Sequence, residues 1–184
     1  MLGYYIVGVL GSISFLYMLF LYGRFDDLHS AIRECWFELD RLFKERYSTS
    51  LLLLGNLGKY GPVTEEITQE LNRSVIQGKN AITLNEQESA EALVSVSIRK
   101  LLAFSRDFPN LNTKKEFNDL VVIIGILEND IRQTIHHYNE LILKYNRLLE
   151  RPSGKRIAAI FNLKKTGTFN LEIPEPPATY KAAI

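Results

Sequence analysis

The stretch that decides the fold is residues 117–148, FNDLVVIIGILENDIRQTIHHYNELILKYNRL, because apolar residues recur in it at heptad spacing. Two lanes run through it, and Thr134 is their single polar position. The lanes are Phe117, Ile124, Ile131, Tyr138 and Tyr145, and Leu120, Leu127, Thr134, Leu141 and Leu148. A heptad repeat of this length predicts a coiled-coil-like helix packed along a nearly straight partner. We expect it over residues 114–150, with a capping box at Thr113 and Glu116 and a stop at Pro152.

Residues 24–60 predict the partner helix. Its apolar positions keep 3-4 spacing before the stripe shifts, and they are Phe25, Leu28, Ile32, Cys35, Leu39, Leu42, Phe43, Tyr47 and Leu51. Aligning the midpoints of two antiparallel helices of about 37 residues pairs residue numbers that sum to about 174. This predicts Trp36 near Tyr138 and an ion pair between Arg46 and Glu128, because heptad counting puts Arg46 on the buried seam, where a charge needs a partner. The alternative is that the shifted stripe turns Arg46 outward to water.

Two shorter helices are expected between the long ones, separated by turns rich in glycine and proline. The segment VTEEITQELNRSVI (63–76) is amphipathic with acids in its first turn, and Asn85 and Glu88 have cap spacing before the next helix. The inward residues of that helix would be Leu93, Val94, Ile98, Leu101, Leu102, Phe104 and Phe108. Short connections favour antiparallel neighbours, so the fold class is all-α, an up-and-down four-helix bundle. After Pro152 we expect a short helix at IAAIF (157–161) and an extended C-terminal tail that alternates Phe169, Leu171 and Ile173.

Residues 2–22 precede this bundle and contain no charged side chain. As a helix they span about 31 Å, enough for the hydrocarbon core of a bilayer, and no cleavage signal is evident. They predict a transmembrane helix in the lipid bilayer, with residues 1–23 as the anchor and 24–184 as the bundle, whose tail covers about 152–184. No Lys or Arg precedes the span, whereas Arg24, Arg33, Arg41 and Lys44 follow it, so the bundle should be cytoplasmic and the N-terminus outside. Gly8 and Ser12 offer a small-residue contact for a homo-oligomer.

Motifs for chemistry are weak. The 22 Lys and Arg balance 21 Asp and Glu without a basic stripe, which argues against nucleic acid as a partner. GNLGKY (55–60) lacks the spacing of a Walker motif, and the adjacent His136 and His137 point about 100° apart, which suits surface histidines rather than metal ligands. Cys35 fits a small core residue. We therefore expect no catalytic, cofactor-binding or metal-binding residues.

Four segments together resemble the LemA family, from about Arg24 to the tail: CWFELDRLFKERY (35–47), FSRDFPNL (104–111), LENDIRQTIHHYN (127–139) and KYN (144–146). The matching residues are Trp36, Asp40, Arg46, Tyr47, Phe108, Pro109, Leu111, Phe117, Glu128, Asn129, Ile131, Tyr138, Asn139, Tyr145 and Asn146. The segment STSLLLL (48–54) departs from the family pattern, since it lacks a proline and an asparagine. The resemblance implies a single N-terminal span in the bacterial inner membrane and a cytoplasmic helical bundle, without an established activity.

The structural or interaction candidates that this resemblance supplies are Trp36, Asp40, Arg46, Pro109, Phe117, Glu128, Tyr138, Asn139, Tyr145 and Asn146. The function expected from all these features is that of a membrane-anchored interaction or scaffold module that recruits a protein partner. The alternative is an enzyme or small-ligand sensor with a site between helices, which a pocket lined by convergent polar groups would favour. A purely structural oligomer built through the anchor is a third reading.

Overall fold

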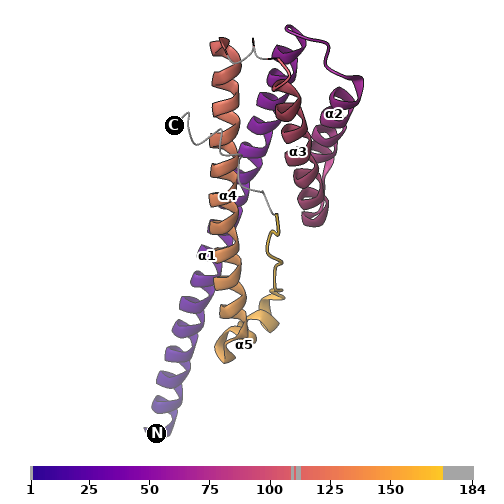
Figure 1. Cartoon of the computed structure of the whole chain (residues 1–184). Coiled ribbons are helices and arrows are strands. Elements are labelled where there is room, and N and C mark those ends of the chain that lie inside the picture. The colour runs from indigo at the N-terminus through magenta and orange to yellow at the C-terminus, as the bar shows by residue number, and fades with distance from the viewer. Residues whose placement is uncertain (1, 109, 111–112, 172–184) are drawn as a thin grey trace. The chain divides into compact units, whose positions relative to one another are not determined.

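The computed structural model describes residues 2–108, 110 and 113–171. Five helices account for most of them, and the described residues contain no strand, so the all-α class is confirmed (Figure 1). The helices are α1 (Leu2–Gly58), α2 (Glu65–Asn80), α3 (Leu84–Ser105), α4 (Lys115–Glu150) and α5 (Pro152–Phe161). The chain forms two compact units, of which the first is Met1–Phe37 with His137–Thr168 and the second is Glu38–His136 with Phe169–Ile184. The helices α1 and α4 each contribute residues to both units.

The start of α3 differs from the expected one by two residues. The side chain of Thr83 accepts a hydrogen bond from the N–H of Glu86 at 3.3 Å, and the Glu86 carboxylate accepts from the N–H of Thr83 at 3.0 Å. This reciprocal pair is a capping box, so the prediction of a cap at Asn85 and Glu88 is wrong. Thr83 and Glu86 have the same spacing as the predicted pair, and with Thr83 as its N-cap the helix begins two residues earlier than predicted.

The heptad lanes of α4 form its inner face. All five residues of the first lane are buried, namely Phe117, Ile124, Ile131, Tyr138 and Tyr145. In the second lane Leu127, Leu141 and Leu148 are buried, whereas Leu120 and Thr134 are half-buried. The helix begins at Lys115, and the hydroxyl of Thr113 donates to the carbonyl oxygen of Asn110 at 2.8 Å. The periodicity therefore identified the buried face, while knobs-into-holes packing stays a prediction.

The core of the first unit is apolar and aromatic. Its buried cluster comprises Leu21, Phe25, Tyr145, Leu148, Leu149 and Ile157. The rings of Phe25 and Tyr145 meet edge to face, with centroids 5.8 Å apart. Trp36 and Tyr138 are 5.7 Å apart with ring planes tilted by 52°, which confirms the contact predicted from the midpoint alignment.

The helix α5 turns tightly against the end of α4. A Cβ at Gly154 would lie 1.9 Å from the carbonyl oxygen of Leu148, so only a glycine fits there. Farther along, the Asn146 side chain donates to the carbonyl oxygen of Thr166 at 2.8 Å and accepts from its N–H at 3.1 Å. These contacts fasten the segment after α5 to the side of α4.

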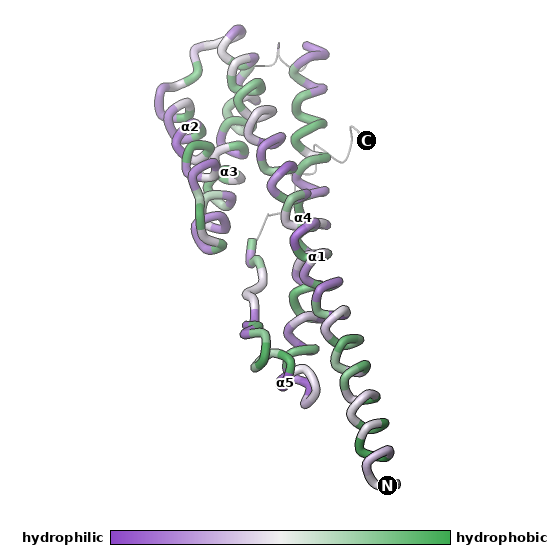
Figure 2. Tube along the Cα trace, turned by 180° about the vertical axis from the view of Figure 1, so that it is seen from behind, coloured by the Kyte–Doolittle hydropathy of each residue, from purple (hydrophilic) through white to green (hydrophobic). Residues whose placement is uncertain are grey.

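The N-terminal residues 2–22 of α1, here called the apolar segment, are largely uncovered. In Figure 1 they extend beyond α5, and Figure 2 colours most of them as hydrophobic or neutral. The large apolar side chains from Tyr4 to Phe20 are exposed with few exceptions, and only 6% of the most apolar window of the helix is buried. By length and composition this helix could cross a membrane.

The second unit combines the later part of α1, the pair α2 and α3, and the earlier part of α4. In α3 the residues Val94, Ile98 and Leu101 are buried as predicted, but Leu93 is 47% exposed. That prediction is wrong because α3 turns Glu91 and Ser95 inward, and this rotation carries Leu93 to the surface. The inward residues predicted for this helix were all apolar, so the inward position of Glu91 and the rotation of α3 were missed.

Residues 169–171 also belong to this unit. Phe169 is buried, with its ring centroid 6.0 Å from that of Phe43, and the N–H of Asn170 donates to the Glu88 carboxylate at 2.6 Å. No helix or strand is assigned to residues 163–171, in agreement with an extended tail. Leu171 is half-buried, and Ile173 lies outside the described residues.

Candidate functional site

A cluster of polar side chains lies buried in the second unit, and it begins with Arg46. The heptad count places Arg46 on the inner face of α1, where its side chain is fully buried. Its guanidinium donates to the carboxylate of Glu91 on α3 and, at 3.1 Å, to the hydroxyl of Ser95. The ring of Phe43 lies beneath it, with the centroid 5.8 Å from Cζ. An arginine can be buried here because a carboxylate, a hydroxyl and an aromatic ring surround its charge.

The Glu91 carboxylate also accepts hydrogen bonds from two neutral donors. The hydroxyl of Tyr47 donates to it, and so does the amide of Gln87 at 2.6 Å. The Gln87 amide additionally lies 3.2 Å from the Tyr47 hydroxyl. Gly78 of α2 makes room for this arrangement, since a Cβ there would lie 2.2 Å from the Tyr47 oxygen. The surroundings of the Glu91 carboxylate are therefore built by three helices, α1, α2 and α3.

Burial controls the protonation of this cluster. Burial raises the pKa of Glu91, while the charge of Arg46 and the donated hydrogen bonds oppose that shift. Burial also raises the pKa of Tyr47, and the neighbouring Glu91 charge raises it further. Tyr47 therefore keeps its proton over the physiological range and acts as a hydrogen-bond donor.

Glu128 of α4 is the second buried carboxylate of the unit. Its pKa is raised by burial and lowered, to a smaller extent, by the charges of Arg46, Arg99 and Arg132. Its Oε1 has no hydrogen-bond partner among the described residues, and the same holds for Nε of Arg46 and one Nη of each of the other two arginines. The cluster thus holds two carboxylates and three guanidinium groups, and several of their polar atoms lack a protein partner.

The structure corrects the predicted partner of Arg46. Arg46 is buried, as the heptad count predicted, but its ion pair is with Glu91, and no ion pair within 4.0 Å joins it to Glu128 in the described part of the chain. The midpoint alignment considered only the two long helices, whereas α3 brings its own carboxylate closer. A signal was present in the sequence, since counting back from Ile98 through Val94 in steps of three and four reaches Glu91.

The other predicted candidates serve packing or local contacts. Phe117, Tyr138 and Tyr145 are buried in the core, Asn139 is half-buried, and Pro109, like Leu111, lies outside the described residues. Asp40 forms an ion pair of 2.6 Å with Lys44 one turn later on α1. His136 and His137 are exposed and Cys35 is buried, each as predicted. No group of three His, Cys, Asp or Glu side chains suited to a metal ion occurs among the described residues.

A second feature of this unit is a groove of about 590 Å³ at the turn between α2 and α3. Its large apolar residues are Ile76, Ile82 and Leu93, whose exposed fractions are 56%, 93% and 47%. The groove is lined further by the amide side chains of Gln77, Asn80 and Asn85. Sequence reasoning missed this surface because Leu93 was assigned to the core.

These features define an all-helical protein with an apolar N-terminal helix and with a buried ion pair between two helices of its second unit. The model of the LemA family matches residues 37–179, and the chain therefore belongs to the LemA family. This match covers Arg46, Glu91 and Glu128 together with both sides of the α2–α3 groove. A search of curated proteins found no relative of the chain.

Proposed function

We propose that the protein is a single-pass membrane protein that displays its bundle on the cytoplasmic face of the bacterial inner membrane. There it acts as a non-catalytic interaction module and recruits another protein. The observation that carries this proposal is the coexistence of two uncovered apolar surfaces, the apolar segment and the α2–α3 groove, on a chain that buries charges elsewhere. Contiguous exposed apolar surface of this kind marks membrane or protein contacts.

The apolar segment suits a bilayer better than a protein interior. Its exposed side chains surround the whole helix, whereas a helix packed on a protein would show one apolar stripe. Tyr4, Tyr5 and Tyr22 are exposed near its two ends, where aromatic residues favour the membrane interface. The cations that follow the segment support a cytoplasmic bundle.

The α2–α3 groove suits an apolar segment of a partner protein. Its rim carries amide groups, and the one carboxylate among its lining residues, Glu86, is engaged by the N–H groups of Ile82 and Thr83. A neutral rim favours an uncharged partner surface. The capping box also fixes the turn that carries Ile82, so little conformational entropy is lost when this side chain docks.

The anchor is tested by extraction of membranes with carbonate. Protein made in bacteria should stay in the membrane pellet and keep its own N-terminus, and a soluble full-length product would contradict the proposal. For orientation, Asp119→Cys is placed on a Cys35→Ser background, because residue 119 is exposed on α4. A thiol reagent that cannot cross membranes should label it only after lysis, and labelling of intact cells would reverse the topology.

The partner is tested with a photoreactive amino acid placed at Ile82 in living cells. We expect a discrete cross-linked protein, and its yield should fall severalfold when Leu93→Glu introduces a charge into the groove. The matched control carries the photoreactive residue at Gln133, an exposed position on α4. The same product from position 133, or a product indifferent to Leu93→Glu, would contradict a partner bound in the groove.

One observation favours a second function, a small-ligand sensor. Arg99, Glu128 and Arg132 each have a buried polar atom without a hydrogen-bond partner among the described residues, and the charges of both arginines act on Glu128, so a small polar molecule would satisfy these atoms. Mono- and dicarboxylic acids should then raise the thermal unfolding midpoint of the full chain, and Arg132→Met should remove the effect. An absent shift across such a series would leave the interaction module as the supported function.

A further inference from the structure

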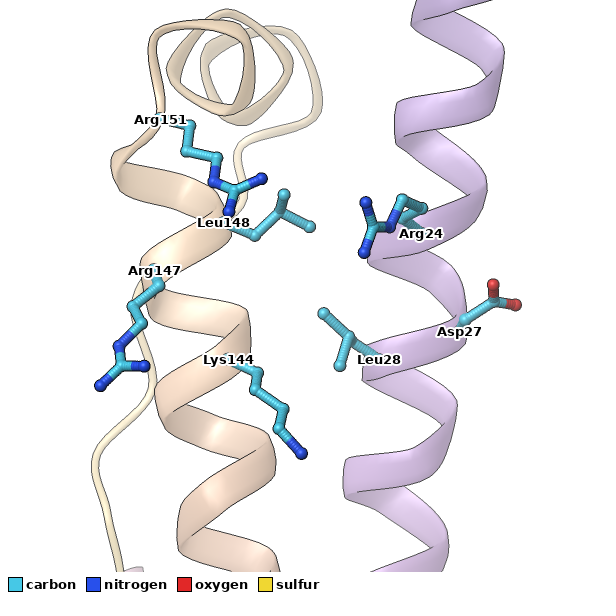
Figure 3. A pocket seen from close by; sticks show the side chains of 7 residues that line it. All are labelled: Arg24, Asp27, Leu28, Lys144, Arg147, Leu148 and Arg151. Atoms are coloured by element: carbon cyan, nitrogen blue, oxygen red, sulfur yellow. The ribbon is translucent and has the colours of Figure 1, made fainter.

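A cationic groove lies in the first unit, between α1 and the last turns of α4. Its volume is about 450 Å³, and its lining residues are Arg24, Asp27, Leu28, Lys144, Arg147, Leu148 and Arg151 (Figure 3). Four of them are cations and one is an acid. In the view of Figure 3, Arg24, Lys144 and Arg151 point into the gap between the helices, whereas Asp27 projects from the side of α1 away from α4 and Arg147 from the side of α4 away from α1. The groove therefore carries a positive charge that its single carboxylate does not neutralise.

The cations of the groove are available to a ligand. All four side chains are exposed. Among the described residues, no ion pair involves Arg24, Arg147 or Arg151. Lys144 has only a long contact of 4.0 Å with Glu140, in which both side chains are about half exposed. Such a contact is weak in water, so an anion of higher charge density can replace it. Leu28 and Leu148 provide an apolar floor between the helices.

The groove lies where α1 leaves the apolar segment. Arg24 is the first charged residue of the chain, two positions after Tyr22. The ring of Tyr22 contacts that of Phe161 on α5, with centroids 4.6 Å apart, so α5 lies at the same level of the unit. On α5 the apolar Ile160 and Phe161 are exposed together with Lys155 and Arg156. Exposed apolar and cationic residues on one short helix are typical of a helix lying in a membrane interface.

We propose that this groove binds the phosphate group of an anionic phospholipid. The inference rests on the proposed membrane anchor, which would hold the groove at the depth of the headgroups. Guanidinium groups recognise phosphate through paired hydrogen bonds, and the apolar floor suits the glycerol and upper acyl carbons of a lipid. A free phosphate ion shares the first of these interactions but gains nothing from the floor. The position and the floor together therefore favour a lipid of the surrounding bilayer.

The test counts lipids retained by the full chain. The protein is purified in neutral detergent and mixed with equal amounts of phosphatidylglycerol and phosphatidylcholine of identical acyl chains. Native mass spectrometry then measures how many of each stay bound. Each interfacial cation favours an anionic lipid by about fivefold, so retention of phosphatidylglycerol should exceed that of phosphatidylcholine at least about fivefold. The excess should shrink as salt is raised.

The test variant replaces the four groove cations together: Arg24→Gln, Lys144→Gln, Arg147→Gln and Arg151→Gln. The matched control replaces four exposed cations of the second unit, Arg73→Gln, Lys79→Gln, Arg106→Gln and Lys115→Gln, and changes the net charge equally. The groove variant should retain both lipids about equally, whereas the control should keep the preference of the wild type. Equal losses in both variants, or an unchanged preference in the groove variant, would overturn the inference.

Two further experiments distinguish a lipid from a free phosphate ion as the occupant, and failure of the lipid site from failure of the membrane anchor. At constant ionic strength, excess inorganic phosphate should leave the preference for phosphatidylglycerol nearly unchanged, and full displacement by phosphate would overturn the lipid as the occupant. Insertion into vesicles of pure phosphatidylcholine, measured by resistance to carbonate, reports on the anchor alone. Insertion without a lipid preference would overturn this inference and leave the proposed function standing, and failure to insert would overturn both.

Discussion

The two units of the molecule handle charge in opposite ways. The first unit fills its interior with apolar and aromatic side chains, such as the edge-to-face pair Phe25 and Tyr145, and exposes the cations of its groove. The second unit buries Arg46, Glu91 and Glu128 among its helices. The contrast also appears within α1 itself. Arg41 is exposed and pairs with Glu38 and Glu45 on its own helix, whereas Arg46, little more than one turn later, is buried and needs a partner from α3.

This difference teaches where specificity resides. An apolar core tolerates exchange among side chains of similar volume, because the interaction has no direction. A buried ion pair tolerates few substitutions, because removal of one partner leaves the other charge buried and uncompensated. The second unit should therefore lose far more stability from one altered charge than the first unit loses from an altered surface cation.

The largest expected effect is the loss of either partner of the buried ion pair. Arg46→Met should lower the free energy of unfolding by about 3–5 kcal/mol, since Glu91 then stays buried without its cation. Glu91→Leu should cost a similar amount. The double variant should recover much of the loss, because two apolar side chains can replace a buried pair. Urea unfolding of the full chain in mild detergent, followed by circular dichroism, measures all three.

The control for this cycle is Arg41→Gln, which should leave the unfolding midpoint unchanged within error because its ion pairs are exposed. A double variant that is as unstable as the sum of its single variants would mean that Arg46 and Glu91 are stabilised independently. The comparison between the units would then lose its basis.

A smaller effect is expected from two glycine substitutions, one in each unit. In Gly154→Ala the new Cβ would lie 1.9 Å from a backbone oxygen, whereas in Gly78→Ala it would lie 2.2 Å from the hydroxyl end of Tyr47. Overpacking costs about 1–3 kcal/mol, and we expect Gly154→Ala at or above the upper end because the backbone yields less than a side chain. Thermal unfolding of the full chain ranks the two.

The matched control is Gly55→Ala, since no atom lies within 4 Å of a Cβ at that position of α1. It should stabilise the protein by up to about 1 kcal/mol, because alanine favours a helix over glycine. If Gly78→Ala proved as harmless as Gly55→Ala, the Tyr47 side chain would have room to move, and the buried cluster would be less rigid than its contacts indicate.

The smallest expected effect concerns pH. Burial raises the pKa of Glu128, so the folded protein binds this proton more tightly than the unfolded chain does. Stability should therefore fall as pH rises from the ordinary carboxyl range through the raised pKa. Glu128→Gln should flatten this fall, by about 1.4 kcal/mol for each unit of pKa shift. Urea unfolding at a series of pH values measures the slope.

Glu86 serves as the control with the opposite sign. Hydrogen bonds from the N–H groups of Ile82 and Thr83 lower its pKa, so its contribution is present above the ordinary carboxyl pKa and is lost as pH falls through the lowered one. Glu86→Gln should therefore weaken stability at neutral pH rather than improve it. A steeper fall with pH in Glu128→Gln would show that the arginines around Glu128 outweigh its burial.

The sequence by itself determined the helices, the apolar segment and much of the core. The heptad lanes of α4 named its buried face, and aligning the midpoints of residues 24–60 and 114–150 predicted the contact between Trp36 and Tyr138. Part of the candidate site was predicted as well, since the heptad count placed Arg46 on the buried face of its helix. These features follow from local periodicity, which fixes the face of a helix that turns inward.

Only the tertiary structure decided that Glu91, and not Glu128, pairs with Arg46, that Leu93 faces outward, and that residues 24–28 and 144–151 share a cationic groove. Each of these depends on how a helix is rotated about its axis and on which neighbour lies beside it. Periodicity leaves that rotation free by part of a turn, because a stripe of apolar residues can pack equally well when slightly turned. The choice is made by the charges and glycines that the packed helices must accommodate together.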